Sequence, residues 1–222
     1  MSDSFEKQAA LAAASILLET NSVHFSPDKP FTFTSGRQSP VYIDCRRLIS
    51  FPRARSKLMD LGAEMITRNI GYESLDAIAG GETAGIPFAA WIAERLSLPM
   101  LYIRKKPKGF GRMAQIEGEM KEGARVLLVE DLASEGTSKI NFIQAIRAAG
   151  GQIAHTFVVF HYGIFPSSVE SLKAEGVLLH GLTTWHDVLA LAHERGSFTD
   201  PQYQAIKSFL DDPEGWKAPA AD

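Results

Sequence analysis

Residues 126–138 read VLLVEDLASEGTS: four apolar residues, two acids, and then a run of small and hydroxyl-bearing residues. The apolar run predicts a buried strand, and the hydroxyls of Thr137 and Ser138 predict the start of a helix. Glu130 and Asp131 lie where the strand is expected to end. A strand that leads through a small-residue loop into a helix is typical of a parallel sheet, whose ligand sites form at the carboxyl ends of its strands.

The same alternation extends through most of the chain. Strands are predicted over 75–79, 100–104, 125–130, 153–160 and 177–184, and helices over 58–65, 86–96, 138–149 and 166–175, with further helices after residue 184. Strands that alternate with helices of this length favour an α/β fold, in which helices cover both faces of a parallel sheet.

The N-terminal part of the chain follows another pattern. Apolar residues at helical spacing predict an amphipathic helix over 4–20. Four prolines between residues 21 and 52 interrupt short apolar runs at 31–33 and 41–43, which predicts irregular structure with one or two short strands. We expect a single domain over 1–212 and a flexible tail over 213–222.

The composition excludes several classes of protein. With 222 residues, 45% hydrophobic and 22% charged, the chain is an ordinary globular one, and its net charge of −3 argues against a nucleic-acid partner. The single cysteine, Cys45, excludes an intrachain disulfide and a cysteine-cluster metal site, and it fits a reducing compartment. Without a signal peptide or an apolar run of about 18 residues, the chain is expected to be soluble and cytoplasmic, with no membrane partner.

The loop after Asp131 has the chemistry of a site for a sugar phosphate. Its backbone N–H groups and the following helix N-terminus favour an anion, and ionised carboxylates accept hydrogen bonds from sugar hydroxyls. In the alternative interpretation the acids merely end a strand and Ser138 caps a helix. A nucleoside-triphosphate loop of the Walker type is excluded, because Lys139 follows the hydroxyls instead of preceding them.

Two further loops follow predicted strands. Residues 104–112, RKKPKGFGR, place five of the 23 cationic residues in nine positions, and their glycines and proline disfavour a helix. Such a loop suits closure over an anion, although a solvated run of charges is the alternative. Residues 79–87, AGGETAGIP, could bring backbone amides close to a diphosphate, or their glycines could serve packing alone.

These three segments, together with TSGRQSPVYID at 34–44, resemble the type I phosphoribosyltransferases and, among them, the orotate phosphoribosyltransferases. The resemblance implies a parallel sheet flanked by helices, with a small N-terminal hood over about 20–52. It implies transfer of the phosphoribosyl group of 5-phosphoribosyl 1-diphosphate to orotate, which gives orotidine 5′-monophosphate and diphosphate. It also implies Mg²⁺, held mainly by substrate and water, and a homodimer in which the loop 104–112 of one subunit closes the partner's site.

The resemblance also suggests roles for single residues. Glu130 and Asp131 would bind the ribose hydroxyls, and Lys108 and Asp131 would be the catalytic residues. The 5′-phosphate would lie on the loop of Leu132, Ala133, Ser134, Glu135, Gly136, Thr137 and Ser138, with the Glu135 carboxylate pointing away from it. The diphosphate would be held by Thr83, Ala84, Arg104, Lys105 and Lys108. Orotate would contact Tyr42, Ile43 and Ser134, and its carboxylate would find donors among Arg37, His161, Tyr162 and the backbone near Tyr42.

Some positions depart from the family pattern. Phe110 stands where many members have a histidine, Thr83 and Ala84 stand where many have tyrosine and lysine, and Thr34 stands where many have lysine. His161 and Tyr162 occupy the place of an Asp-Arg pair. Two alternatives therefore stay open: a phosphoribosyltransferase for another base, and a regulator that binds phosphoribosyl diphosphate or a nucleotide without turnover.

Overall fold

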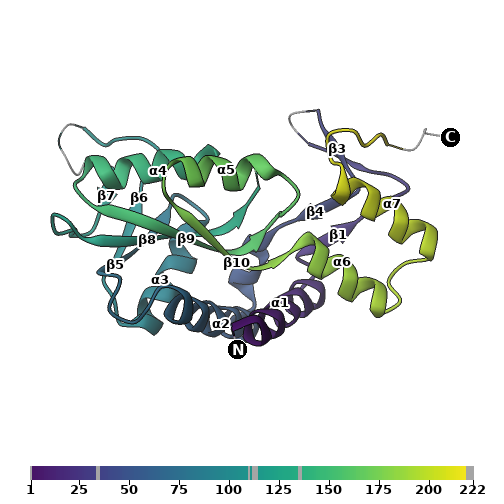
Figure 1. Ribbon diagram of the computed structural model, residues 1–222, viewed down its shortest axis with the longest axis horizontal. Coiled ribbons are helices and arrows are strands. Elements are labelled where there is room, and N and C mark those ends of the chain that lie inside the picture. Colours follow the sequence, from purple (N-terminus) through teal and green to yellow (C-terminus); the bar gives the residue numbers. More distant parts are fainter. Residues whose placement is uncertain (1, 34–35, 110, 112–114, 135–136, 219–222) are drawn as a thin grey trace.

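The computed structural model describes residues 2–33, 36–109, 111, 115–134 and 137–218 (Figure 1). Within this part of the chain a six-stranded sheet has the order β10-β9-β8-β5-β6-β7. The strands are β5 (Ala77–Gly81), β6 (Met100–Ile103), β7 (Ile116–Glu117), β8 (Arg125–Ala133), β9 (Gln152–His161) and β10 (Leu178–Thr184). Neighbouring strands are parallel, except that β7 runs antiparallel to β6. The predicted α/β fold with a mainly parallel sheet is confirmed.

Helices cover both faces of this sheet, as predicted. On one face lie α1 (Ser2–Glu19), α2 (Pro52–Asn69) and α3 (Gly85–Leu96), and on the other lie α4 (Thr137–Ala148) and α5 (Pro166–Ala174) (Figure 1). Side chains of a strand point alternately to the two faces. In β8, Leu127 and Val129 therefore join the core beside α1–α3, whereas Val126 and Leu128 join the core beside α4 and α5.

The segment 20–52 forms two small antiparallel sheets outside the main one. β1 (Val23–Phe25) pairs with β4 (Val41–Ile43), and β2 (Phe31–Thr32) pairs with β3 (Gln38–Ser39). The 3₁₀ helix η1 (Cys45–Ser50) then leads into α2. The sequence predicted β2 and β4 but not β1 and β3, because strands of two or three residues carry almost no periodic signal.

The C-terminal helices α6 (Trp185–Glu194) and α7 (Asp200–Asp211) pack on this N-terminal segment (Figure 1). Phe25 meets Phe198 edge to face with ring centroids 4.7 Å apart, and Gln202 Nε2 donates to Asp28 Oδ2 at 3.1 Å. Trp216, in the expected tail, packs against Phe209. Both ends of the chain thus build the same side of the molecule.

One element boundary differs from the sequence-based prediction in a way that concerns the site. β8 continues to Ala133, so the two acids lie inside the strand rather than after it. The continuation is explained by pairing with β9, in which Leu132 and Ala133 are opposite Phe160 and His161. Among the described residues, no helix is long and apolar enough to cross a membrane.

Candidate active site

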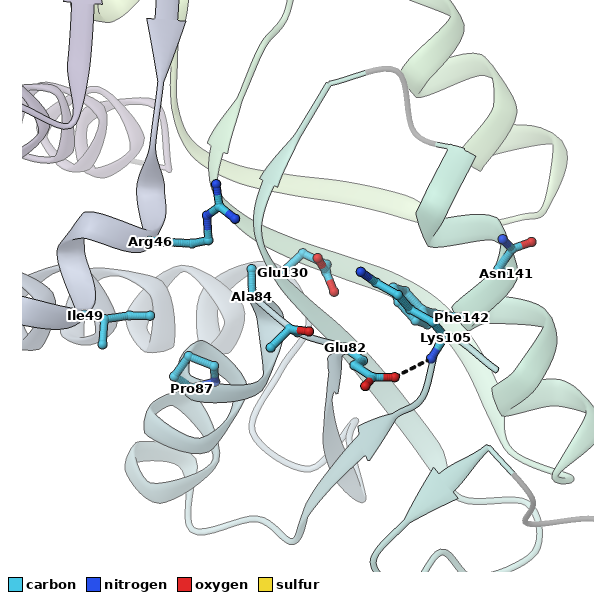
Figure 2. A pocket seen from close by; sticks show the side chains of 10 residues that line it. Arg46, Ile49, Glu82, Ala84, Pro87, Lys105, Glu130, Asn141 and Phe142 are labelled. Carbon is cyan, nitrogen blue, oxygen red and sulfur yellow. Dashed lines mark hydrogen bonds between the residues drawn. The ribbon is translucent and has the colours of Figure 1, made fainter. Parts of the chain in front are cut away.

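A cavity of about 650 Å³ opens near the carboxyl ends of β5 and β8 (Figure 2). Its lining comes from η1, the β5–α3 loop, α3, the start of the basic loop, β8 and α4. The lining residues are Arg46, Ile49, Glu82, Thr83, Ala84, Pro87, Lys105, Glu130, Asn141 and Phe142. Four predicted residues, Thr83, Ala84, Lys105 and Glu130, are therefore brought together in one place, as expected where parallel strands end.

Glu130 lies in the middle of the cavity wall, with only 8% of its surface exposed (Figure 2). Its carboxylate fits against two glycines: a Cβ added to Gly81 would come within 1.8 Å of Glu130 Oε1, and one added to Gly85 within 2.6 Å. Burial raises the pKa of Glu130, while nearby Lys139 opposes this rise. Within the described part of the chain Oε1 is buried and has no hydrogen-bond partner.

The glycines of loop 79–87 are thus explained partly by close packing of α3 and partly by the space that the Glu130 carboxylate needs. A Cβ on Gly80 would come within 2.7 Å of Gly85 O and 2.8 Å of Ala89 Cβ, so Gly80 allows α3 to approach β5 closely. Gly81 and Gly85 instead make room for the Glu130 carboxylate. The peptide bond between Glu82 and Thr83 is cis.

Asp131 points to the opposite face of β8, because adjacent residues of a strand alternate. It is 7% exposed, and its Oδ1 accepts a hydrogen bond from Leu132 N at 2.9 Å. Its neighbourhood includes Cys45, a buried free thiol, and Arg46. Burial raises the pKa of Asp131, and the Leu132 N–H and the cation of Lys139 oppose the rise. The two carboxylates therefore lie on opposite faces of β8, near its carboxyl end.

The expected phosphate loop begins inside β8. Leu132 is half-buried, Ala133 is buried and Ser134 is half-buried. Glu135 and Gly136 lie outside the described residues, so the orientation expected for the Glu135 carboxylate stays a prediction. Thr137 and Ser138 open α4, and nothing is described of their side chains.

The basic loop is the connection between β6 and β7, an antiparallel pair that was not predicted. Its base is tied by hydrogen bonds from Arg104 N to Gln115 O at 2.8 Å and from Gln115 Nε2 to Arg104 O at 3.1 Å. The Arg104 guanidinium pairs with Glu117 at 3.2 Å, which directs it along the hairpin. Lys105 lines the cavity, and Lys108 is exposed. Phe110 and Arg112 lie outside the described residues.

A contact joins the basic loop to the glycine-rich loop. Lys105 N donates to Glu82 Oε2 at 2.8 Å (Figure 2), and Glu82 N donates to Ile103 O at 2.8 Å. The two loops expected to hold the diphosphate are therefore linked at the cavity rim.

The residues predicted for the base lie beside the cavity lining rather than in it. Tyr42 is half-buried in an aromatic group of the N-terminal segment, with ring centroids 5.7 Å from Phe31 and 6.4 Å from Phe33. Ile43 is 4% exposed and belongs to the core. Thr34 and Ser35 are outside the described residues.

The three candidate donors for the orotate carboxylate lie near the β9–α5 connection. The Arg37 guanidinium lies 5.1 Å from the centroid of the Phe165 ring, so its charge reaches the β9–α5 connection from the N-terminal segment. His161 Nε2 is 3.3 Å from Ser168 Oγ, and burial lowers its pKa, which favours the neutral ring. Tyr162 stacks on Phe165 in the core, where burial raises the pKa of its phenol.

Two charged residues near the acids were not predicted as site residues. Arg46 lines the cavity from η1 and is held by Asp44 at 3.2 Å. Lys139, in the first turn of α4, is buried, with Nζ donating to Leu132 O at 2.8 Å. Its position was readable from the sequence, since Lys139 shares helical spacing i, i+3, i+4 with the buried Phe142 and Ile143.

Comparisons with known proteins agree with this geometry. The family model "Phosphoribosyl transferase domain" matches residues 55–171. The orotate phosphoribosyltransferase of Dinoroseobacter shibae is 58% identical over 97% of this chain and 96% of its own length. The crystal structure of orotate phosphoribosyltransferase from Aeropyrum pernix matches with a TM-score of 0.70 and 32% identity, over 84% of this chain and 99% of that one. The structure of Leishmania donovani UMP synthase matches with a TM-score of 0.76 and 29% identity, over 92% of this chain, which spans 42% of that longer one.

Proposed function

This chain belongs to the orotate phosphoribosyltransferase family, and we propose that the cavity beside Glu130 is where it joins 5-phosphoribosyl 1-diphosphate to orotate. The reaction gives orotidine 5′-monophosphate and diphosphate in pyrimidine biosynthesis. Membership in an enzyme family rules against the alternative of a regulator without turnover. The observation that carries the proposed location is the buried pair Glu130–Asp131 at the carboxyl end of β8, between two polar loops.

The residues present suit a substitution at C1 of the ribose. Departure of diphosphate leaves positive charge on the sugar ring, so the protein has to fix the ribose and stabilise the leaving group rather than supply a nucleophile. The Glu130 and Asp131 carboxylates would accept the ribose hydroxyls, and loop 132–138 with the start of α4 would hold the 5′-phosphate. Lys105 at the cavity rim and the exposed Lys108 would neutralise the departing diphosphate.

The base is expected on the side of the N-terminal segment. Tyr42 and backbone N–H groups near it would contact the pyrimidine, with Ser134 reaching it from β8. Arg37 is the charged candidate for the orotate carboxylate, because neutral His161 and core-bound Tyr162 offer no charge there. Arg37→Ala should raise the KM for orotate and leave the KM for phosphoribosyl diphosphate unchanged. An unchanged orotate KM would remove Arg37 from the base site.

Mg²⁺ is proposed as the metal, bound mainly to diphosphate oxygens and water. Among the described residues no group of three His, Cys, Asp or Glu side chains lies close enough to hold an ion, and a hard ion carried by a phosphate substrate does not need such a group. When bound, the ion would neutralise charge that develops on the departing diphosphate.

A homodimer with the basic loop acting in trans is also proposed. Its support is the family resemblance and the exposure of Lys108, which lies on a loop beyond the contacts that Arg104 and Lys105 make at its start. A heterodimer of one Lys108→Ala subunit and one Asp131→Asn subunit tests it. If loops act in trans, one site has both wild-type residues and activity returns; a verified heterodimer without recovered activity refutes the arrangement.

Whether the diphosphate binds in this cavity can be tested separately. Lys105→Ala removes a cation from its lining, so the KM for phosphoribosyl diphosphate should rise by about tenfold or more, the usual worth of a hydrogen bond to a charged group. Lys173→Ala, an exposed lysine on α5, is the matched control and should leave this KM unchanged. Equal KM values for both variants would place the diphosphate elsewhere.

A further inference from the structure

Lys139 is a buried lysine at a place where a helix disfavours a cation. It lies in the first turn of α4 and is 3% exposed. The N-terminus of a helix carries partial positive charge, so a cation there is repelled, and burial of an ammonium group adds a desolvation cost. Lysine is almost never fully buried unless it is paired. The surroundings of Lys139 must therefore compensate for both costs.

Those surroundings are the carbonyl and the carboxylates of the strand end. Nζ donates to Leu132 O at 2.8 Å, which ties the start of α4 to the residue that follows the acid pair. Burial raises the pKa of Glu130 to about 8 and also raises that of Asp131, and the nearby Lys139 cation opposes both rises. Burial lowers the pKa of Lys139 itself.

Other charged or titratable groups reach the same acids from neighbouring elements. Lys105 of the basic loop acts on Glu130, while Arg46 and the Cys45 thiol of η1 lie near Asp131. The Lys139 cation, like burial, lowers the pKa of His161 in β9 and so keeps its ring neutral. Lys139 is the most deeply buried of the cations around the pair.

We propose that Lys139 is a positioning residue that holds the Leu132 carbonyl and favours the ionised form of the Glu130–Asp131 pair, in which both carboxylates accept hydrogen bonds from the ribose. This inference rests on the proposed role of the pair in ribose binding. Two neighbouring buried carboxylates do not both ionise without a compensating charge, and a carboxyl that keeps its proton becomes a donor. Lys139 supplies that charge from inside the protein.

The carbonyl contact adds a geometric effect. Leu132 is the first residue after the acids, and the expected phosphate loop continues from it. The hydrogen bond from Lys139 to Leu132 O joins the start of this loop to α4. The groups that bind the ribose hydroxyls and those that bind the 5′-phosphate are thereby kept at a constant distance from each other.

The first test is the pH profile of kcat/KM for phosphoribosyl diphosphate in Lys139→Met, which keeps the length of the side chain without its charge. Loss of a neighbouring opposite charge raises a carboxyl pKa by about one unit or more, so the acidic limb should move to higher pH and kcat/KM should fall about tenfold or more on that limb. At high pH the variant should approach the wild-type value. Lys173→Met, on the exposed surface of α5, is the control and should keep the wild-type profile.

A purely structural role for Lys139 predicts another result. Loss of packing alone would lower kcat/KM by the same factor at every pH, with an unshifted limb, and that outcome overturns the proposal. An unchanged profile and an unchanged rate also overturn it.

A double-mutant cycle covers the case in which Lys139→Met folds poorly. Unfolding by urea, without substrate, is measured for Lys139→Met, Glu130→Gln and the double variant. If Lys139 compensates the buried acid, Glu130→Gln should restore part of the unfolding midpoint lost in Lys139→Met. Additive losses would refute the pairing. Because this readout needs no catalysis, it separates failure of the Lys139 proposal from failure of the ribose assignment, which Asp131→Asn tests.

Discussion

Asp131→Asn tests the ribose-binding role while disturbing the fold least. Asparagine has nearly the volume of aspartate, and its side-chain oxygen can still accept the hydrogen bond from Leu132 N. What is lost is a charged acceptor at a site that is 7% exposed. A hydrogen bond to a charged group contributes about 1.5–3 kcal/mol, so kcat/KM for phosphoribosyl diphosphate should fall by about 10- to 160-fold.

The assay is the consumption of orotate followed at several concentrations of phosphoribosyl diphosphate, together with thermal unfolding of the same preparation. The unfolding temperature should change little, since Lys139 keeps Glu130 as a partner. Asp76→Asn is the matched control: Asp76 pairs with Arg125 at the other end of β8, and its loss should leave kcat/KM at the wild-type value. Wild-type kcat/KM in Asp131→Asn would refute the reasoning.

Three further outcomes are expected. Lys108→Ala should lower kcat more than it raises KM, because the charge of Lys108 matters most when diphosphate departs; steady-state kinetics that show only a raised KM would contradict this. Gly81→Ala should destabilise the fold by about 1–3 kcal/mol in urea unfolding and reduce activity, because the added Cβ would displace the Glu130 carboxylate. Gly176→Ala is the control for steric overlap, since a Cβ there meets nothing within 4 Å, but its positive φ adds backbone strain of its own. His180 has its pKa lowered to about 4 by burial and by His155, whose Nδ1 is 3.0 Å from His180 Nε2. The neutral ring therefore contributes stability above pH 6.5 that is lost as the pH falls toward 4, and His180→Asn should flatten this dependence in acid unfolding, whereas an unchanged slope would argue against it.

The parallel sheet could be predicted because its strands are long enough to show a pattern. The apolar run 126–129 and the acids after it were recognised, and the structure places Glu130 at the cavity as expected. The end of β8 was not predicted correctly, because two acids usually mark the end of a buried strand. Only the pairing with β9 shows that the strand continues to Ala133.

The cations around the acid pair illustrate what sequence reasoning misses. Lys139 lies on the apolar face of α4, so its burial could have been inferred, but not that Leu132 O would accept a hydrogen bond from it. Arg46 lies on η1, far from Glu130 in sequence, and no local pattern indicates that it lines the same cavity. Contacts between distant segments depend on packing, which a single sequence does not display.

The joint packing of the two chain ends has a consequence for synthesis on the ribosome. The main sheet is finished when β10 has emerged, at Thr184, and its six strands can then pair. The N-terminal segment has been made long before, yet the side-chain contacts of Phe25 and Asp28 with α6, Phe198 and α7 can form only when those residues leave the exit tunnel. The half of the site expected to hold the phosphoribosyl group can therefore form during translation, whereas the half expected to hold the base is completed only when nearly the whole chain has been released.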